Sequence, residues 1–307
     1  LLNGLITVVS RTLALTLLIL TLISRKGGDM NKFLLIGTDS EYFVQNEQGI
    51  ITSAIDQIGG SKDKPRLVMH GNLQEDNVLA EFAINPVQLK SSWLGSIESV
   101  TNTLRVVVEK RGLSLVKKSS HMYDKELLLS FPSAAMELGC DPDYNVYNNL
   151  PNEKPSARTR LRTAAGHVHF SYVRPTEEAT SLIIKAMDYV LGLWSVIEDS
   201  DVARRELYGK AGSCRFKEYG GEYRTLGNFW LEDTGAMSYV YDMTKLCTQN
   251  PEEIIRRCAL VLNQRELVRI IDNCDKPMAA LHYNSIVGVI NEMQAEAVGT
   301  EDVKLSA

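Results

Sequence analysis

The residues best suited to chemistry in this chain lie in the stretch YGGEYRTLGNFW at 219–230. Glu222 and Arg224 stand two residues apart there, and residues at that spacing on a strand point to the same face. A half-buried strand with a simple ion pair would explain the pattern. A carboxylate that binds a metal ion beside a guanidinium that binds phosphate would explain it as well.

Carboxylates at strand spacing recur nearer the N-terminus. Asp39 and Glu41 lie two apart in GTDSEYFV, and a divalent cation such as Mg²⁺ lets two carboxylates share one face; a polar turn is the alternative. Glu81 lies in an apolar run, where an unpaired carboxylate is costly. Its alternative is an edge strand whose side chain faces water. Three further polar residues precede Glu81, and the sequence does not choose among them as ligands: Glu75, Asp76 and Asn77.

Histidines and arginines supply the remaining candidates. His167 and His169 share a face in GHVHFS and could bind a divalent ion or donate to phosphate, although a buried structural histidine is the usual alternative. A basic run follows, made of Arg204, Arg205, Lys210, Arg215, Lys217 and Arg224. For its first two members, a solvated charged face is the simpler interpretation. Arg215 and Arg224 alternate with aromatic residues, and their planar forks suit phosphate.

Composition excludes several classes of protein. The chain has 307 residues, of which 44% are hydrophobic, and a net charge of −5; this is ordinary globular composition without a general electrostatic attraction to nucleic acid or anionic membrane. Five scattered cysteines without a CxxC pair argue against a disulfide framework or a structural zinc site and fit a reducing cytosol. The chain has no glycine-rich phosphate loop. Any bound nucleotide would therefore be held by metal ions and arginines.

The elements that must position these residues follow from hydrophobic periodicity and turn signals. Helices are predicted at 88–111, 176–199, 201–209, 236–248, 251–265 and 276–295. Strands are predicted at 32–37, 42–45, 66–71, 77–84, 114–118 and 164–173, with two more in 212–226 that a turn at Gly220-Gly221 would join. Residues 55–65 and 137–160 are predicted as loops. This order predicts an α+β fold, in which helices cover one face of an antiparallel sheet.

The chain divides into three segments. Residues 1–24 are almost wholly apolar but are interrupted by Arg11. The codons GGA-GGU-GAU-AUG would spell Gly27 to Met30 and form a bacterial ribosome-binding site before a start codon. We therefore interpret 1–29 as translated upstream sequence, with a hydrophobic leader or anchor as the alternative; the nucleotide sequence tests this. A single catalytic domain is predicted at 30–298 and a flexible tail at 299–307.

Taken in order, these motifs resemble the phage-type COOH–NH2 ligase (amidoligase) branch of the glutamine synthetase / glutamate–cysteine ligase superfamily. The resemblance spans about residues 33–230, and YGGEYR with the preceding GKAG..R is its most specific part. It implies a glutamine synthetase-like catalytic domain with a curved antiparallel sheet. It also implies a site on the sheet that holds ATP and two or three Mg²⁺ ions.

The resemblance implies a role for each motif. The implied metal ligands are Asp39, Glu41, Glu81, His169 and Glu222. The implied nucleotide-binding residues are His167, His169, Lys210, Arg215 and Arg224. Catalytic roles fall to Arg215, Glu222 and Arg224. The family's usual Glu-x-Glu is Asp-x-Glu here, so the first ligand has a shorter arm, which could shift or weaken one metal site.

The implied reaction joins a carboxylate to an amine at the expense of ATP, through an acyl phosphate. We expect small-molecule or peptide substrates, no nucleic acid or membrane partner, and a location in the cytoplasm of a bacterium or a phage-infected host. A guanidino-kinase-like phosphotransferase, a divalent-metal hydrolase and a non-enzymatic scaffold with a degenerate site are the alternatives. The sequence fixes neither the substrates nor the oligomeric state.

Overall fold

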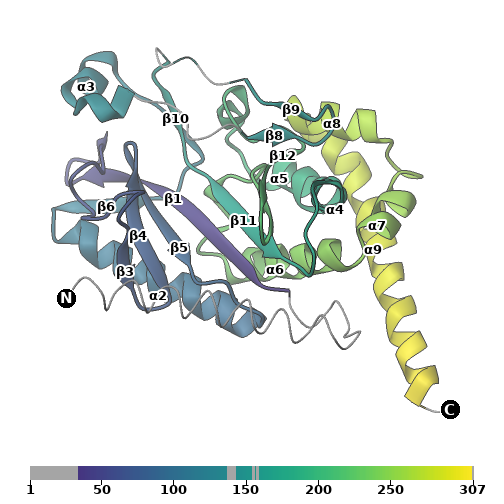
Figure 1. Ribbon diagram of the computed structural model, residues 1–307. Helices are drawn as coiled ribbons and strands as arrows, with labels where there is room; N and C mark the ends of the chain where they lie inside the picture. The colour runs from purple at the N-terminus through teal and green to yellow at the C-terminus, as the bar shows by residue number, and fades with distance from the viewer. Residues whose placement is uncertain (1–33, 137–142, 154–155, 157–158, 306–307) are drawn as a thin grey trace.

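The computed structural model describes residues 34–136, 143–153, 156 and 159–305 (Figure 1). The predicted leader at 1–29 and parts of the predicted loop at 137–160, including Cys140, lie outside these residues. The other four cysteines are free thiols: Cys214, Cys247, Cys258 and Cys274.

One antiparallel sheet of eleven strands forms the centre of the protein. In the order of the sheet, nine of its strands are β3 (Arg66–Val68), β4 (Gly71–Asp76), β5 (Leu79–Ile84), β1 (Ile36–Asn46), β11 (Gly166–Ser171), β13 (Gly220–Tyr223), β12 (Ser213–Lys217), β8 (Tyr144–Asn145) and β9 (Leu150–Pro151). Two more strands pair with β1, namely β2 (Ile51–Thr52) and β6 (Leu113–Val116). A separate ribbon joins β7 (Ser120–Met122) to β10 (Leu161–Thr163).

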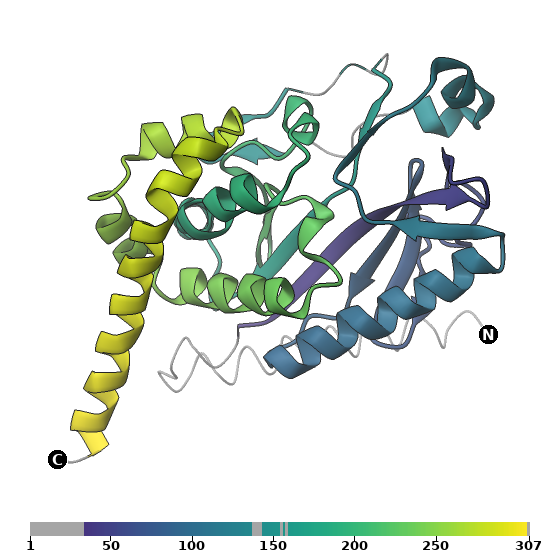
Figure 2. The same cartoon turned by 180° about the vertical axis from the view of Figure 1, so that it is seen from behind.

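A layer of helices covers one face of this sheet, which confirms the predicted α+β fold class. The α-helices are α2 (Lys90–Glu109), α3 (Lys125–Ser130), α4 (Glu177–Met187), α5 (Leu193–Glu198), α6 (Thr234–Gln249), α7 (Pro251–Cys258), α8 (Gln264–Asp272) and α9 (Lys276–Leu305). Shorter turns are η2 (Ser133–Met136), η4 (Ala203–Glu206), η5 (Asn228–Trp230) and the π-helical η3 (Asp188–Gly192). Seen from behind, α2, α4, α5 and α6 lie in front of the sheet, and α3 lies apart (Figure 2).

The main core lies between the sheet and this helical layer. Alternate residues of β1, such as Tyr42 and Val44, are fully buried there with the strand residues Val168 and Phe170. Trp93 and Trp230 stack within it with 5.8 Å between ring centroids. Because successive strand residues point to opposite faces, the polar side chains between these apolar ones are directed to the other face of the sheet.

The polar residues TDSE do not interrupt the first strand, whereas the sequence predicts two short strands on either side of them. β1 runs through them because the hydroxyls that face the helices find partners. Thr38 Oγ1 donates to the carbonyl of His167 at 2.6 Å and lies 2.8 Å from Ser40 Oγ. The strand therefore keeps Asp39 and Glu41 on one face, as their spacing predicts.

Two predicted helices also differ from the structure. The helix predicted at 251–265 ends at Cys258, and α8 begins after Asn263, whose side chain accepts a hydrogen bond from Glu266 N at 3.0 Å. α9 continues to Leu305, past the start of the predicted flexible tail. The mobility of that segment stays a prediction.

The helix predicted at 176–199 begins, as expected, with Thr176, whose hydroxyl accepts from Ala179 N at 3.1 Å. The π-turn η3 divides it into α4 and α5. Within the described residues, Glu177–Glu198 is the one helical stretch long and apolar enough to cross a membrane, and 78% of its most apolar window is buried inside the protein. That burial is typical of a core helix.

The glycine pair at 220–221 lies within β13, not at the predicted turn. The turn consists of Glu218 and Tyr219, and Gly220 pairs with Lys217 across it. Gly220 has a φ of +149°, and a Cβ there would lie 2.2 Å from the carbonyl oxygen of Phe170. The glycine therefore lets β13 approach β11 closely.

We predict that Gly220→Ala destabilises the protein by roughly 1–3 kcal/mol, because its Cβ meets a backbone atom that cannot move without breaking the sheet. Gly95→Ala is the matched control, since a Cβ at this helical position in α2 meets nothing within 4 Å. It should stabilise the protein by about 1 kcal/mol. Urea denaturation measures both, and equal effects of the two changes would contradict the prediction.

Candidate active site

A cavity of about 510 Å³ opens on the face of the sheet opposite to the main core. Seven of the predicted site residues line it: Asp39, Glu41, Glu81, His167, Arg215, Glu222 and Arg224. Six of them come from five strands that are adjacent in the sheet, β5, β1, β11, β13 and β12, and Arg224 directly follows β13. The sheet therefore brings together residues that are far apart in the sequence.

Strand register sets which of these residues lie side by side. The paired positions are Gln74 with Glu81, Glu81 with Glu41, Asp39 with His167, His169 with Glu222, and Glu222 with Arg215. Glu81 is not on an edge strand, as the alternative interpretation required, because β5 lies between β4 and β1. The pairings form two neighbouring groups of opposite charge in one cavity.

The first group, here called the acidic half, consists of Glu41, Asp76 and Glu81. Each offers a carboxylate oxygen within 4.8 Å of the other two. Glu41 accepts from Ala165 N at 2.6 Å, and Glu81 accepts from the Gln74 amide at 2.9 Å. In the part of the chain that the structure describes, none of the three forms an ion pair.

The pKa values of the acidic half reflect the absence of such an ion pair. Burial and the neighbouring Asp76 raise the pKa of Glu41 to about 8. Burial and the charge of Asp39 raise the pKa of Glu81 well above its ordinary value. A cation bound among the three would relieve both effects. Three carboxylates are the hard oxygen ligands that Mg²⁺ prefers, so the residues present fit a magnesium ion.

The second group, here called the basic half, surrounds Glu222 with cations. The Glu222 carboxylate contacts the Arg224 guanidinium, and it lies 3.5 Å from Arg215 Nη1 and 3.2 Å from Lys217 Nζ. Burial and Asp39 oppose its ionisation, but Arg224 and the two histidines outweigh them and lower the pKa of Glu222 to about 2. One carboxylate thus faces three cationic side chains.

Asp39 connects the basic half to the histidines. Its Oδ1 lies 3.1 Å from His167 Nδ1 and 3.2 Å from His169 Nε2. Burial opposes ionisation of Asp39, but the charges of both histidines hold its pKa well below the ordinary value. Burial and Arg224 lower the pKa of His167 to about 4, so this imidazole is neutral.

Between the two histidines, the geometry favours His167 as a metal ligand. His167 groups with Asp39 and Glu222 within ligand distance of a common point, whereas the resemblance assigns this role more firmly to His169. The ring of His169 is engaged on both sides, since its Nδ1 lies 2.7 Å from Tyr219 Oη and its Nε2 faces Asp39.

The structure shows which of Glu75, Asp76 and Asn77 could be a metal ligand. Asp76 belongs to the acidic half. Glu75 points elsewhere and accepts from the backbone amides of Asp56 and Ile58 at 3.0 and 2.9 Å. Asn77 lines the cavity, and its amide donates to Ala134 O at 2.8 Å. Asp76 is therefore the ligand candidate.

Lys210 does not line this cavity, contrary to the expectation that it contacts nucleotide. It lines a neighbouring cavity of about 450 Å³, and its Nζ lies 3.5 Å from the carbonyl of Asp272. The next lysine, Lys217, is the last residue of β12 and lines the active-site cavity instead. Strand alternation gives Lys217 the same face as Arg215, a signal already present in the sequence.

Arg204 and Arg205 are buried, which contradicts their interpretation as a solvated face. Only 3% and 5% of these residues is exposed. Arg204 lines the candidate site, whereas Arg205 donates to Ser195 Oγ at 2.6 Å. This burial could not be predicted from the sequence, because a pair of adjacent arginines in a short turn is usually exposed.

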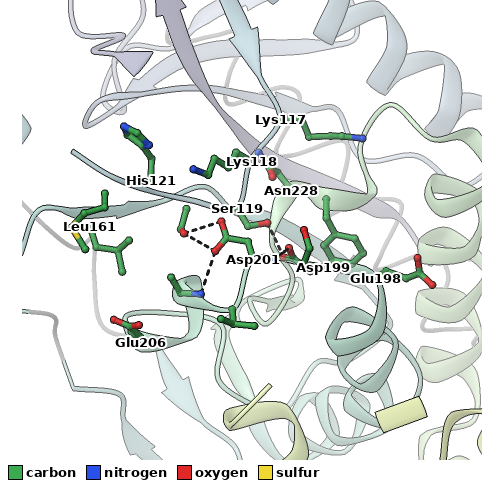
Figure 3. Close-up of a pocket in the computed structure, with 16 residues that line it drawn as sticks. Lys117, Lys118, Ser119, His121, Leu161, Glu198, Asp199, Asp201, Glu206 and Asn228 are labelled. Carbon is green, nitrogen blue, oxygen red and sulfur yellow. Dashed lines mark hydrogen bonds between the residues drawn. The ribbon is translucent and has the colours of Figure 1, made fainter. Parts of the chain in front are cut away.

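A second cavity, of about 650 Å³, lies beside the β7–β10 ribbon (Figure 3). Two of its carboxylates accept hydrogen bonds: Asp199 accepts from Ser119 Oγ at 2.7 Å, and Asp201 accepts from Ser120 Oγ at 2.7 Å (Figure 3). Lys117 donates to the carbonyl of Leu231 at 2.7 Å. Among the described residues, both groups of side chains that could hold a metal ion lie in the active-site cavity rather than here.

The chain is similar to one known family. Residues 156–273 match the model of the family described as Phage phiEco32-like COOH.NH2 ligase-type 2. The predicted resemblance is confirmed. The matched segment of the ligase family contains both histidines of the site and the whole basic half, whereas Asp39 and the acidic half precede it.

Two wider comparisons complete this result. A solved structure described as "GmaS/ADP complex-Conformation 1" is similar with a TM-score of 0.37 and 10% sequence identity, over 85% of this chain and 70% of that chain. A TM-score of this size supports no conclusion about the site. No curated protein matches the chain.

We predict that the metal-free protein loses stability between about pH 4.5 and 8. The ordinary pKa of Glu41 is 4.5, and folding raises it to about 8. Its protonated form is thus favoured in the folded state, and this contribution is complete below pH 4.5 and lost as the pH rises through 8. The loss is on the order of a few kcal/mol.

Urea denaturation in EDTA at pH 5 and pH 8 measures this loss of stability. The wild type is compared with Glu41→Gln, because other buried acids titrate in both proteins. The glutamine keeps an acceptor for Ala165 N but cannot ionise. Added Mg²⁺ should stabilise the wild type at pH 8 more than the variant. An identical pH dependence in the two proteins would contradict the assigned pKa.

Proposed function

We propose that this protein is an ATP- and Mg²⁺-dependent carboxylate–amine ligase, acting through an acyl phosphate. One observation carries the proposal: three clustered carboxylates without an ion pair among the described residues adjoin three cationic side chains in a single cavity. A divalent cation and a polyphosphate are complementary to these two halves. The name of the family matched by residues 156–273 supports amide formation as the reaction.

The basic half would hold the phosphates of ATP. Arg215 and Arg224 present planar guanidinium groups, which bind phosphoryl oxygens in pairs, and Lys217 adds a point charge. Because the rigid sheet positions these cations, little reorganisation is needed when charge spreads over the transferred group. Their arrangement also compensates for the missing glycine-rich loop.

The acidic half would hold magnesium, with Glu41, Asp76 and Glu81 as ligands and a second site at Asp39, His167 and Glu222. When bound, such an ion neutralises charge on the phosphates and the substrate carboxylate. The side chains themselves keep the two anions in one cavity. Glu222 in addition aligns Arg215 and Arg224 through its contacts with both.

The proposed reaction has two balanced steps. A carboxylate oxygen of the acid substrate bonds to the γ-phosphorus of ATP, the bond to the β–γ bridging oxygen breaks, and ADP leaves. The amine nitrogen then bonds to the activated carbonyl carbon, phosphate leaves with the electron pair of the broken bond, and the nitrogen releases a proton. No enzyme nucleophile is required, which agrees with the free and largely buried cysteines. Both substrates, small molecules or peptides, would be cytoplasmic.

Product analysis separates this proposal from its alternatives. A ligase forms ADP, phosphate and an amide in equal amounts, and needs both an acid and an amine. A guanidino-kinase-like phosphotransferase forms ADP and a phosphorylated acceptor without phosphate release. A metal hydrolase needs no ATP. Mass spectrometry of mixtures of ATP, Mg²⁺ and panels of acids and amines distinguishes the three.

We predict that Glu222→Gln or Arg215→Ala lowers Mg²⁺-dependent ADP formation by about 10²–10³-fold, because each removes a preorganised charge at the phosphoryl site. Both proteins should remain folded by circular dichroism. Arg269→Ala is the control, since this exposed arginine pairs with Glu266 and Asp275 on the surface and does not line the cavity. Near wild-type turnover in either site variant would refute the assignment.

A further inference from the structure

Two buried residues, an aspartate and an arginine, hold the end of β13 beside the active site. Asp188 lies in the π-turn η3 and is fully buried, and Arg204 in η4 is 3% exposed. Neither forms an ion pair in the part of the chain that the structure describes. Their hydrogen bonds converge instead on residues 223–225, which follow Glu222 and include Arg224.

The Asp188 carboxylate contacts side chains of this segment. Its Oδ1 accepts from Tyr223 Oη at 2.6 Å, and Thr225 Oγ1 lies 3.5 Å from the same oxygen. Its Oδ2 accepts from Gly212 N at 2.7 Å, just before β12, and from Tyr147 Oη at 2.9 Å. One carboxylate thus joins the two strands that carry the basic half.

The Arg204 guanidinium binds the backbone of the same segment. Its Nη1 donates to the carbonyl of Thr225 at 2.9 Å and its Nη2 to the carbonyl of Arg224 at 3.2 Å. A planar guanidinium holds its two Nη donors in a fixed fork that suits two successive carbonyls, whereas a lysine ammonium is a compact point charge on a flexible stem. Gly209 leaves room for this fork, because a Cβ there would lie 1.8 Å from Arg204 Nη1.

We propose that Asp188 and Arg204 form a clamp that positions Arg224 toward the transferred phosphoryl group. The inference rests on the proposed function. Each residue is a positioning residue, since its hydrogen-bonding atoms contact the protein rather than a substrate. The π-turn fits this role: the extra residue in the helix places Asp188 against β13, and such turns are often found near functional sites.

The clamp is tested with Asp188→Asn and Arg204→Lys. Asparagine has one acceptor oxygen for groups that now use two, and lysine lacks the fixed fork that contacts both carbonyls. Matched controls are Asp199→Asn and Arg205→Lys, which alter residues that are also buried and whose hydrogen-bond partners lie outside 223–225. Melting temperatures establish that all four proteins are folded.

The clamp predicts a fall in kcat of about tenfold or more in Asp188→Asn and Arg204→Lys, because an ångström of misplacement has effects of this size. KM for ATP should change less than kcat, because Arg215 and Lys217 still hold the phosphates of ATP in these variants. In an Arg224→Lys background, Arg204→Lys should have almost no further effect, as expected for residues that act through one another. The controls should retain wild-type kcat.

Hydrogen–deuterium exchange gives a readout that does not need activity. The peptide covering 219–228 should exchange faster in the two clamp variants than in wild type or the controls. Wild-type kcat in both clamp variants, with unchanged exchange, would overturn the clamp. If wild type forms no amide with any acid–amine pair, the proposed function fails, and the exchange rates alone decide whether the clamp exists.

Discussion

Burial of like charge is the constraint on which the rest of the structure depends. Glu41 and Glu81 are largely removed from water beside Asp76, without an ion pair among the described residues. Buried carboxylates without compensating charge are costly. The fold must offset this with stability from elsewhere. The large apolar core between the sheet and the helical layer supplies that stability on the opposite face of the same strands.

An antiparallel sheet makes this division simple. Each strand presents apolar residues to the helices and ionisable residues to the cavity, so one register fixes both the core and the site. Phe170 and Tyr223 pack toward the core, while His169 and Glu222 are paired on the other face. A slip of one residue would bury the charges in the core, and the core therefore enforces the geometry of the site.

Sequence spacing predicted the shared faces of the site residues, because strand alternation is a local property. It could not predict that Asp39 and Glu41 would serve different groups, since that depends on which residues the neighbouring strands place opposite them. The choice of Asp76 over Glu75 likewise follows from the pairing of β4 with β5. The burial of Arg204 depends on carbonyls from a segment twenty residues later. The turn at Glu218-Tyr219 was missed because the adjacent glycines satisfy a tertiary contact with β11 instead.

The ion pair between Glu222 and Arg224, the simpler interpretation of YGGEYR, exists. It does not exclude a role in binding phosphate. Glu222 contacts three cations, and one of them, Arg224, also lies 3.9 Å from Asp143. The carboxylate limits repulsion among the cations when no anion is bound, and it holds them at separations that an incoming phosphate can use. The same carboxylate can thus stabilise the empty site and keep the cations in place for a polyanion, which a strand held by a single ion pair would not do.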